Sequence, residues 1–181
     1  MAVGVLIQPV GAVDISDLIY VKEELARRFP VRLDVTVSMW PLQLPISAFN
    51  WSRMQYRADL VNSYVSSRLS GLIGGSRFAL AIVGADGYVE GLNFVFGLAS
   101  RDIGVASVYV PRLRLGADQA LYRLRLLKES MHELGHLLGL EHCDNPRCVM
   151  SFSNSLDEVD RKDAAFCDRC ALKLARAWPR A

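Results

Sequence analysis

The amino-acid sequence predicts an α/β domain built on a mixed, twisted β-sheet with one antiparallel edge strand. Short apolar segments, typical of buried strands, alternate with longer segments whose apolar residues recur every three or four positions, as in amphipathic helices. Strands joined through a helix are expected to be parallel, whereas a strand reached by a short connection can pair antiparallel at the sheet edge. The chain has 181 residues, 51% of them hydrophobic, which suits one packed domain.

The first half of the chain begins with an apolar strand and continues with an amphipathic helix. Asp14 or Ser16 can cap this helix, and Pro30 ends it. Alternating apolar side chains then predict a half-buried strand, and a segment with two prolines predicts a loop. In order, we expect a strand at 2–9, a helix ending at residue 28, a strand at 31–37, a loop at 38–50 and a helix at 54–69.

The second half contains three short strands and then a long helix, for which Asp118 is a suitable N-cap. The strand at 93–98 is the one that we expect at the antiparallel edge. Beyond residue 142, turn residues and cysteine pairs replace the α/β pattern. The predicted elements are strands at 78–83, 93–98 and 106–110, a connection at 111–116, and helices at 118–138 and 168–178.

The charge and hydropathy of the chain argue against two classes of partner. A formal net charge of +2 is too mild for a nucleic-acid-binding protein. No apolar stretch is long enough to cross a bilayer, and the first residues lack the basic segment of a signal peptide. We therefore expect a cytoplasmic protein, in which disulfides are rare, and we favour a monomer.

Three histidines, the only ones in the chain, lie at the end of the predicted long helix. Residues four apart share one face of a helix, so His132 and His136 can bind one zinc ion. Gly139 can end the helix and turn the chain, which brings His142 round as a third ligand. Three protein ligands leave a position for water, beside which Glu133 is the predicted general base. The alternative is a set of ordinary core or surface histidines.

The spacing His132-Glu-x-x-His136-x-x-Gly139-x-x-His142 resembles the metzincin clan of zinc peptidases. The resemblance implies that Met150 lies in a tight turn and forms an apolar floor under the metal ligands; the alternative is a plain core methionine. It also implies a peptide substrate that lies antiparallel to the edge strand of the sheet. The residues expected to bind the peptide are Asn93, Phe94, Val95, Phe96 and Gly97, unless this strand serves only the sheet.

The four cysteines form two pairs, one of them a CxxC, in the last quarter of the chain. In a cytosolic protein, this pattern predicts a closed, structural Cys₄ zinc site. The alternatives are two disulfides, four free thiols or a redox-active CxxC. The predicted ligands are Cys143, Cys148, Cys167 and Cys170. Because Cys143 directly follows His142, one metal site is expected to brace the other.

The combined pattern from His132 to Cys170 resembles the archaemetzincins. The resemblance implies a metzincin-like α/β fold with an active-site helix beneath the sheet, and two zinc ions, one catalytic and one structural. We expect residues 1–142 to form a catalytic subdomain, and residues 143–181 to form a C-terminal subdomain with the Met-turn, the Cys₄ zinc site and the terminal helix. The implied function is hydrolysis of peptide bonds by Glu133-assisted attack of zinc-bound water, with aminopeptidase activity in some members.

Two other functions remain open at this point. The first is a zinc-stabilised protein that binds peptides or a partner with little or no catalysis. Glu133 argues against it, because a binding role needs no base beside an open metal position. The second is a zinc module that binds nucleic acid, against which the near-neutral charge argues.

Overall fold

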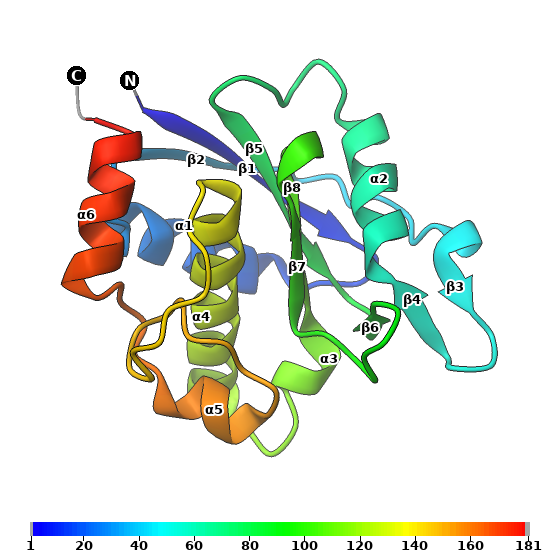
Figure 1. Cartoon of the computed structure of the whole chain (residues 1–181). Helices are drawn as coiled ribbons and strands as arrows, with labels where there is room; N and C mark the ends of the chain where they lie inside the picture. The colour runs from blue at the N-terminus through cyan, green and yellow to red at the C-terminus, as the bar shows by residue number, and fades with distance from the viewer. Residues whose placement is uncertain (1, 180–181) are drawn as a thin grey trace.

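The structure, a computed structural model, describes residues 2–179. Five strands form the main sheet: β1 (Val3–Val10), β2 (Leu33–Val37), β5 (Arg77–Val83), β7 (Gly97–Ser100) and β8 (Val105–Tyr109). Their order across the sheet is β2-β1-β5-β8-β7 (Figure 1). Strands β2, β1, β5 and β8 run parallel to one another, whereas β7 pairs antiparallel with β8 at the edge of the sheet. The predicted fold class, a mixed sheet with an antiparallel edge strand, is confirmed.

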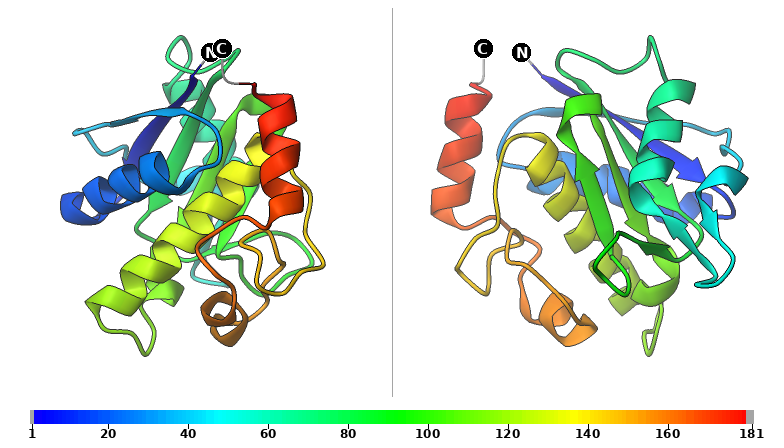
Figure 2. Two further views of the ribbon diagram at one scale, coloured as in Figure 1. Left: turned by 90° about the vertical axis from the view of Figure 1, so that its left-hand side faces the viewer. Right: turned by 45° about the vertical axis from the view of Figure 1, so that its right-hand side comes forward.

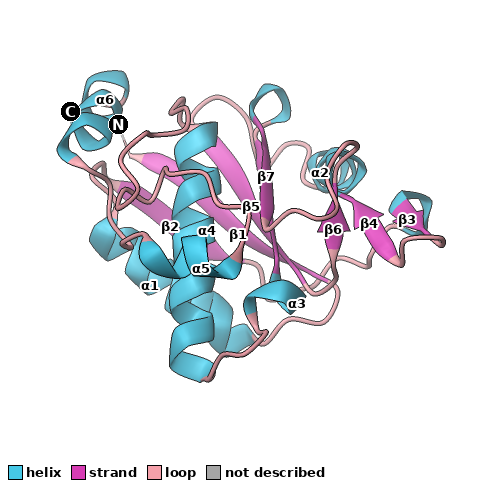
Figure 3. Ribbon diagram, turned by 60° about the horizontal axis from the view of Figure 1, so that its bottom comes forward, coloured by secondary structure: helices cyan, strands magenta, loops and turns pink. Residues whose placement is uncertain are grey.

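Helices cover both faces of this sheet (Figure 1; Figure 3). One face packs against α1 (Ile15–Arg28) and α4 (Gln119–Leu137), and the other against α2 (Ala58–Arg68). Side chains along a strand alternate between faces. In β5, Leu80 and Ile82 therefore join the core under α1 and α4, whereas Ala79, Ala81 and Val83 join the core under α2.

Both predicted helix caps are present. The side chain of Asp14 accepts a hydrogen bond from Ser16 N, and that of Asp118 accepts one from Leu121 N at 2.8 Å. Each cap satisfies a backbone N–H that the first turn of the helix leaves unpaired. The cap at Asp118 thus sets the start of α4, the helix that carries the histidines.

The chain beyond α4 folds back onto the end of that helix. It forms α5 (Leu156–Arg161) and α6 (Asp168–Ala177), and α6 lies beside the C-terminal end of α4 (Figure 2). The indole N–H of Trp178 donates to Leu138 O at 3.1 Å. Val149, Met150 and Leu174 are fully buried in the same core as α4. The predicted C-terminal helix is present, while α5 was not expected.

The edge strand begins later than predicted. Gly97 lies in β7, but the prediction was wrong for four residues that precede the strand: Asn93, Phe94, Val95 and Phe96. The N–H of Val95 donates to Gly87 O at 2.9 Å, outside the main sheet. The ladder with β8 therefore starts only where Tyr109 N donates to Phe96 O.

A second, small sheet was also not predicted. It consists of β3 (Phe49–Asn50), β4 (Gln55–Arg57) and β6 (Gly87–Tyr88). Because β4 pairs with both neighbours, the helix expected at 54–69 begins only at Ala58. The expected connection at 111–116 includes most of a short helix, α3 (Val110–Leu113).

No helix within residues 2–179 combines the length and the apolar character that a membrane crossing requires.

Candidate metal centre

The three histidines converge at the C-terminal end of α4. The Nε2 atoms of His132 and His136 lie 3.0 Å apart, one helical turn from each other. Gly139, with a φ of 102°, ends the helix in a conformation that favours glycine. The turn brings the ring centroid of His142 to 5.3 Å from that of His132 and 4.8 Å from that of His136. Phe152 contacts the His142 ring edge-on.

Backbone carbonyls orient the first two imidazoles. Nδ1 of His132 lies 2.8 Å from Val149 O, and Nδ1 of His136 lies 2.8 Å from Leu140 O. When Nδ1 carries the proton and donates it to the carbonyl, Nε2 keeps its lone pair for a metal. Burial lowers the pKa of both histidines, most strongly that of His132, and so favours the neutral form that binds metal.

The geometry of these side chains fits a zinc ion with an open position. Tetrahedral zinc with Zn–N bonds of about 2.0–2.1 Å separates two nitrogen ligands by about 3.3 Å. The 3.0 Å between the Nε2 atoms of His132 and His136 is close to this value. One ligand atom from each histidine lies within 4.8 Å of the other two, and no fourth His, Cys, Asp or Glu in residues 2–179 joins the group.

Glu133 lies on the side of α4 that faces β7, where it is only 6% exposed. A Cβ atom at Gly97 would lie 2.5 Å from Cγ and Oε1 of Glu133, so only glycine permits this close approach of the strand. Burial raises the pKa of Glu133 well above its ordinary value; Glu129 adds to this effect and Lys162 opposes it. A carboxyl group with a raised pKa is suited to accept and return a proton near neutral pH.

A buried ion pair lies one helical turn before Glu133. Nζ of Lys162 is 2.8 Å from Oε1 of Glu129, and the two side chains are 1% and 4% exposed. The positive charge of Lys162 lowers the pKa of Glu133 and of all three histidines. Sequence reasoning missed this pair, because Lys162 is a single lysine far from the motif and only the fold brings it to Glu129.

Met150 lies against α4 beneath the histidines and is fully buried. A Cβ atom at Gly135 would overlap Sδ of Met150, so this glycine allows the turn to approach the helix between His132 and His136. The carbonyl of Met150 accepts a hydrogen bond from Cys143 N at 2.9 Å. Gly135 was not predicted, because it occupies a position at which the His-Glu-x-x-His motif specifies no residue.

A groove runs along β7 in front of the histidines. It consists of a cavity of about 410 Å³, which includes Glu133 in its lining, and an adjoining cavity of about 700 Å³. We call the two together the β7 groove. Both cavities share Val89, Leu98, Ala99 and Arg101. Four of the five predicted strand residues line the groove, namely Phe94, Val95, Phe96 and Gly97, whereas Asn93 does not.

The outer edge of β7 offers unpaired main-chain groups. Tyr109 N donates to Phe96 O, and hydrogen-bonded pairs alternate along an antiparallel ladder. The main-chain N–H and C=O groups of Leu98 and Ser100 therefore point toward β8 and form the hydrogen bonds of the ladder. Gly97 and Ala99 turn their N–H and C=O groups away from β8, on the side where an added strand can pair.

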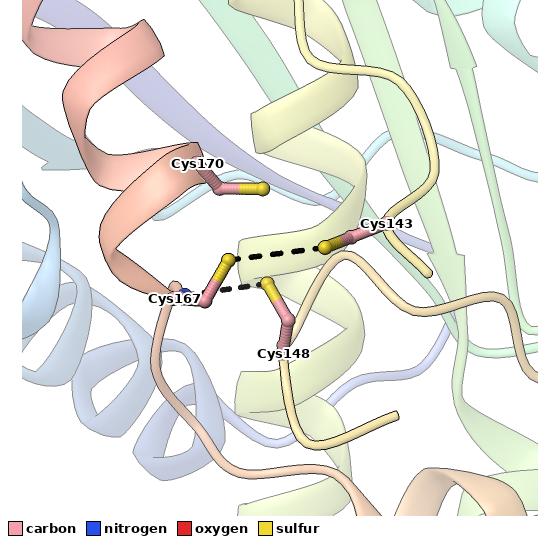
Figure 4. Close-up of side chains that lie close together, drawn as sticks. All are labelled: Cys143, Cys148, Cys167 and Cys170. Atoms are coloured by element: carbon pink, nitrogen blue, oxygen red, sulfur yellow. Dashed lines mark hydrogen bonds between the residues drawn. The ribbon is translucent and has the colours of Figure 1, made fainter. Parts of the chain in front are cut away.

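The four cysteine sulfurs cluster between the loop after α4 and the start of α6 (Figure 4). All four cysteines are free, which excludes the disulfide alternative in this structure. Sγ of Cys143 lies 3.8 Å from Sγ of Cys167, the separation that tetrahedral zinc with Zn–S bonds of about 2.3 Å produces. Burial raises the pKa of Cys143, but hydrogen bonds from Asn145 N and Arg169 outweigh this effect and lower it to about 7. This environment favours the thiolate that binds metal.

Comparisons with known proteins agree with this geometry. The model of Peptidase family M54 matches residues 31–176. An archaemetzincin from Aeropyrum pernix is 50% identical over 155 residues, which cover 83% of this chain and 84% of that protein. An archaemetzincin from Saccharolobus solfataricus is 44% identical and covers 74% of this chain and 73% of its own.

The crystal structure of an archaemetzincin from Methanopyrus kandleri matches with a TM-score of 0.82 and 36% identity, covering 99% of this chain and 97% of that one. A crystal structure from Archaeoglobus fulgidus, an archaemetzincin complexed with malonate, matches with a TM-score of 0.79 and 36% identity, covering 94% and 99%. The family model spans most of the chain and the fold agrees almost throughout. The chain therefore belongs to peptidase family M54, the archaemetzincins, and is a zinc metallopeptidase.

Proposed function

We propose that His132, His136 and His142 hold the catalytic zinc and that Glu133 is the general base for peptide-bond hydrolysis. The observation that carries the proposal is the convergence of three imidazoles with no fourth protein ligand among residues 2–179, next to a buried carboxyl group. Zinc bound there supplies a Lewis acid that polarises the scissile carbonyl group and makes a bound water more acidic.

In this proposal, Glu133 accepts a proton from the attacking water and delivers it to the nitrogen of the leaving amine. Burial of its carboxyl group raises the pKa and so makes the return of the proton easier. The main chain at Gly97 keeps the carboxyl in one place, because it packs directly against Cγ and Oε1. The carbonyls of Val149 and Leu140 hold the two helix imidazoles in the orientation that a metal requires.

We further propose that the four cysteines hold a second, structural zinc, which gives two zinc ions per chain. The 3.8 Å separation between Cys143 and Cys167 and the sulfur cluster as a whole support it. Four thiolates fill the coordination shell, so this metal has no position for substrate. The role of Met150 is to pack as an apolar floor under the histidines.

The substrate of this proposal is a peptide that adds to the outer edge of β7. Gly97 and Ala99 present their main-chain groups there, and strand addition uses such groups with little dependence on side chains. The second cavity of the β7 groove lies beside Leu98 to Asp102, toward the C-terminal end of β7, which favours a peptide that extends several residues N-terminal to the scissile bond. Aminopeptidase activity stays a prediction, and N-acetylated peptides test it, because an aminopeptidase leaves them intact. Cytoplasmic location and a monomeric state also stay predictions.

The decisive experiment combines a peptide library with metal analysis. The zinc-loaded protein is expected to cleave some peptides, to lose turnover with o-phenanthroline, and to carry two zinc ions. Glu133→Gln is expected to lower kcat by at least about a hundredfold, the size of a general-base contribution, with the metal content and the fold unchanged. Full turnover in a metal-loaded Glu133→Gln preparation would contradict the mechanism. Tight peptide binding without any cleavage by the unaltered protein would instead favour the binding hypothesis.

A further inference from the structure

Arg101 occupies a distinctive position at the end of β7. It directly follows the strand and lines both cavities of the β7 groove. Its guanidinium lies over the turn that ends α4: three guanidinium atoms are 3.2–3.6 Å from the point that a Cβ atom would occupy at Gly139. This turn comes three residues after His136. The guanidinium is therefore held beside the metal centre, where the two cavities meet.

The charge of Arg101 has no carboxylate partner among residues 2–179. Arg112, at the other end of the sheet edge, is instead paired and lies 2.7 Å from Asp86. In the second cavity, Asp59 and Glu90 both pair with Arg57 instead. Arg101 thus brings an unpaired guanidinium, with donors arranged to bind a carboxylate through two hydrogen bonds, to the wall of the groove.

The strand geometry sets the distance of this charge from the scissile bond. Gly97, which contacts Glu133, is four residues before Arg101, or about 13 Å along a strand. Along α4, six residues from Glu133 to Gly139 correspond to about 9 Å. An extended peptide advances about 3.3 Å per residue, so the guanidinium lies about three or four residues from the bond beside Glu133. In a peptide antiparallel to β7, those residues are on the N-terminal side of the bond.

We propose that Arg101 is a specificity-determining residue that binds an acidic side chain three or four positions N-terminal to the scissile bond. The inference rests on the proposed peptidase function and on the antiparallel orientation of the peptide. It adds a charge requirement to main-chain pairing at Gly97 and Ala99, which by itself distinguishes few sequences.

The test uses peptides that differ only by Glu or Gln at one position, scanned along both sides of a cleaved bond. The unaltered protein is expected to show about a tenfold higher kcat/KM for Glu at the third or fourth N-terminal position, the size of a charge-assisted hydrogen bond. Arg101→Gln should bring this ratio close to one, because only the Glu peptides lose a charged partner. Arg101→Lys keeps the charge without the planar fork and should retain part of the preference.

Arg68→Gln is the matched control, because Arg68 is an exposed arginine that lines neither cavity. It should keep the full Glu preference. An unchanged ratio in Arg101→Gln, or a preference for Glu on the C-terminal side of the bond, would overturn the proposal.

A binding measurement separates this inference from the proposed function. The same Glu and Gln peptides, immobilised, are exposed to zinc-loaded Glu133→Gln protein with either Arg or Gln at position 101. Stronger retention of the Glu peptides that depends on Arg101 and weakens with added salt supports the inference, even if Glu133 proves not to be the general base. Equal retention by the two proteins refutes it, even if cleavage is efficient.

Discussion

Loss of the buried lysine next to the metal centre should destabilise the protein far more than loss of an exposed ion pair. At the observed 2.8 Å, the attraction between Lys162 and Glu129 is about 6 kcal/mol for an effective dielectric constant of 20. The desolvation of two ions, several kcal/mol each, offsets this attraction, so the intact pair contributes little net stability. Lys162→Met removes the attraction but leaves a buried carboxylate, and should lower the free energy of unfolding by about 3–5 kcal/mol.

The assay is urea unfolding of the zinc-loaded protein, followed by tryptophan fluorescence and far-UV circular dichroism. The double variant Lys162→Met with Glu129→Leu removes both charges, and should recover most of the lost stability. Arg147→Met is the control: the Arg147–Asp163 pair is 65% and 50% exposed, so its loss should cost less than about 1 kcal/mol. If Lys162→Met itself does not fold, a folded double variant still supports the reasoning. A single variant that loses no more than the control, or a double variant no more stable than the single, would refute it.

Three further perturbations follow from close contacts at the two proposed metal sites. Gly97→Ala places a Cβ 2.5 Å from Glu133 and should lower kcat/KM at least about tenfold with two zinc ions still bound, as measured by peptide cleavage and metal analysis. Gly135→Ala forces Met150 away from α4 and should reduce stability by about 1–3 kcal/mol in thermal unfolding; an unchanged Tm would show that the turn moves freely. Cys148→Ser should empty the cysteine site and weaken zinc binding at the histidines by at least about tenfold in a chelator competition, because both sites share one loop; equal affinity would show that they are independent.

The parts of the fold that the sequence predicted are those set by local patterns. The caps at Asp14 and Asp118 follow from residue type within one segment, and the parallel pairing of the strands follows from the helices that connect them. The approach of His132 to His136 follows from helix geometry alone, since residues four apart lie on one face. The approach of His142 to the other two histidines depends on one further residue, Gly139, whose positive φ the pattern predicted.

The parts that the sequence did not predict depend on contacts between distant segments. The start of β7 is decided by Val95, which pairs with Gly87 before the ladder to β8 begins, and no periodicity in 93–98 reports this. Gly135 matters only because Met150 arrives against it from a later turn. Lys162 matters only because the fold buries it beside Glu129. Such side chains look ordinary in the sequence, because the feature that distinguishes each of them is its partner.

The loop between His142 and Met150 explains how the two proposed metal sites can support each other in a small domain. Val149 O orients His132 through Nδ1, and Cys143 N donates to Met150 O across the base of the loop. The same loop supplies His142 to one site and Cys143 to the other, so any movement of the loop shifts ligands at both. Backbone hydrogen bonds join the two ends of the loop, and the sulfurs of Cys143 and Cys148 lie close to those of Cys167 and Cys170 at the start of α6. Filling the cysteine site therefore fixes the loop to α6, and the rigid loop in turn holds His142 and the carbonyl of Val149 where the histidine site requires them.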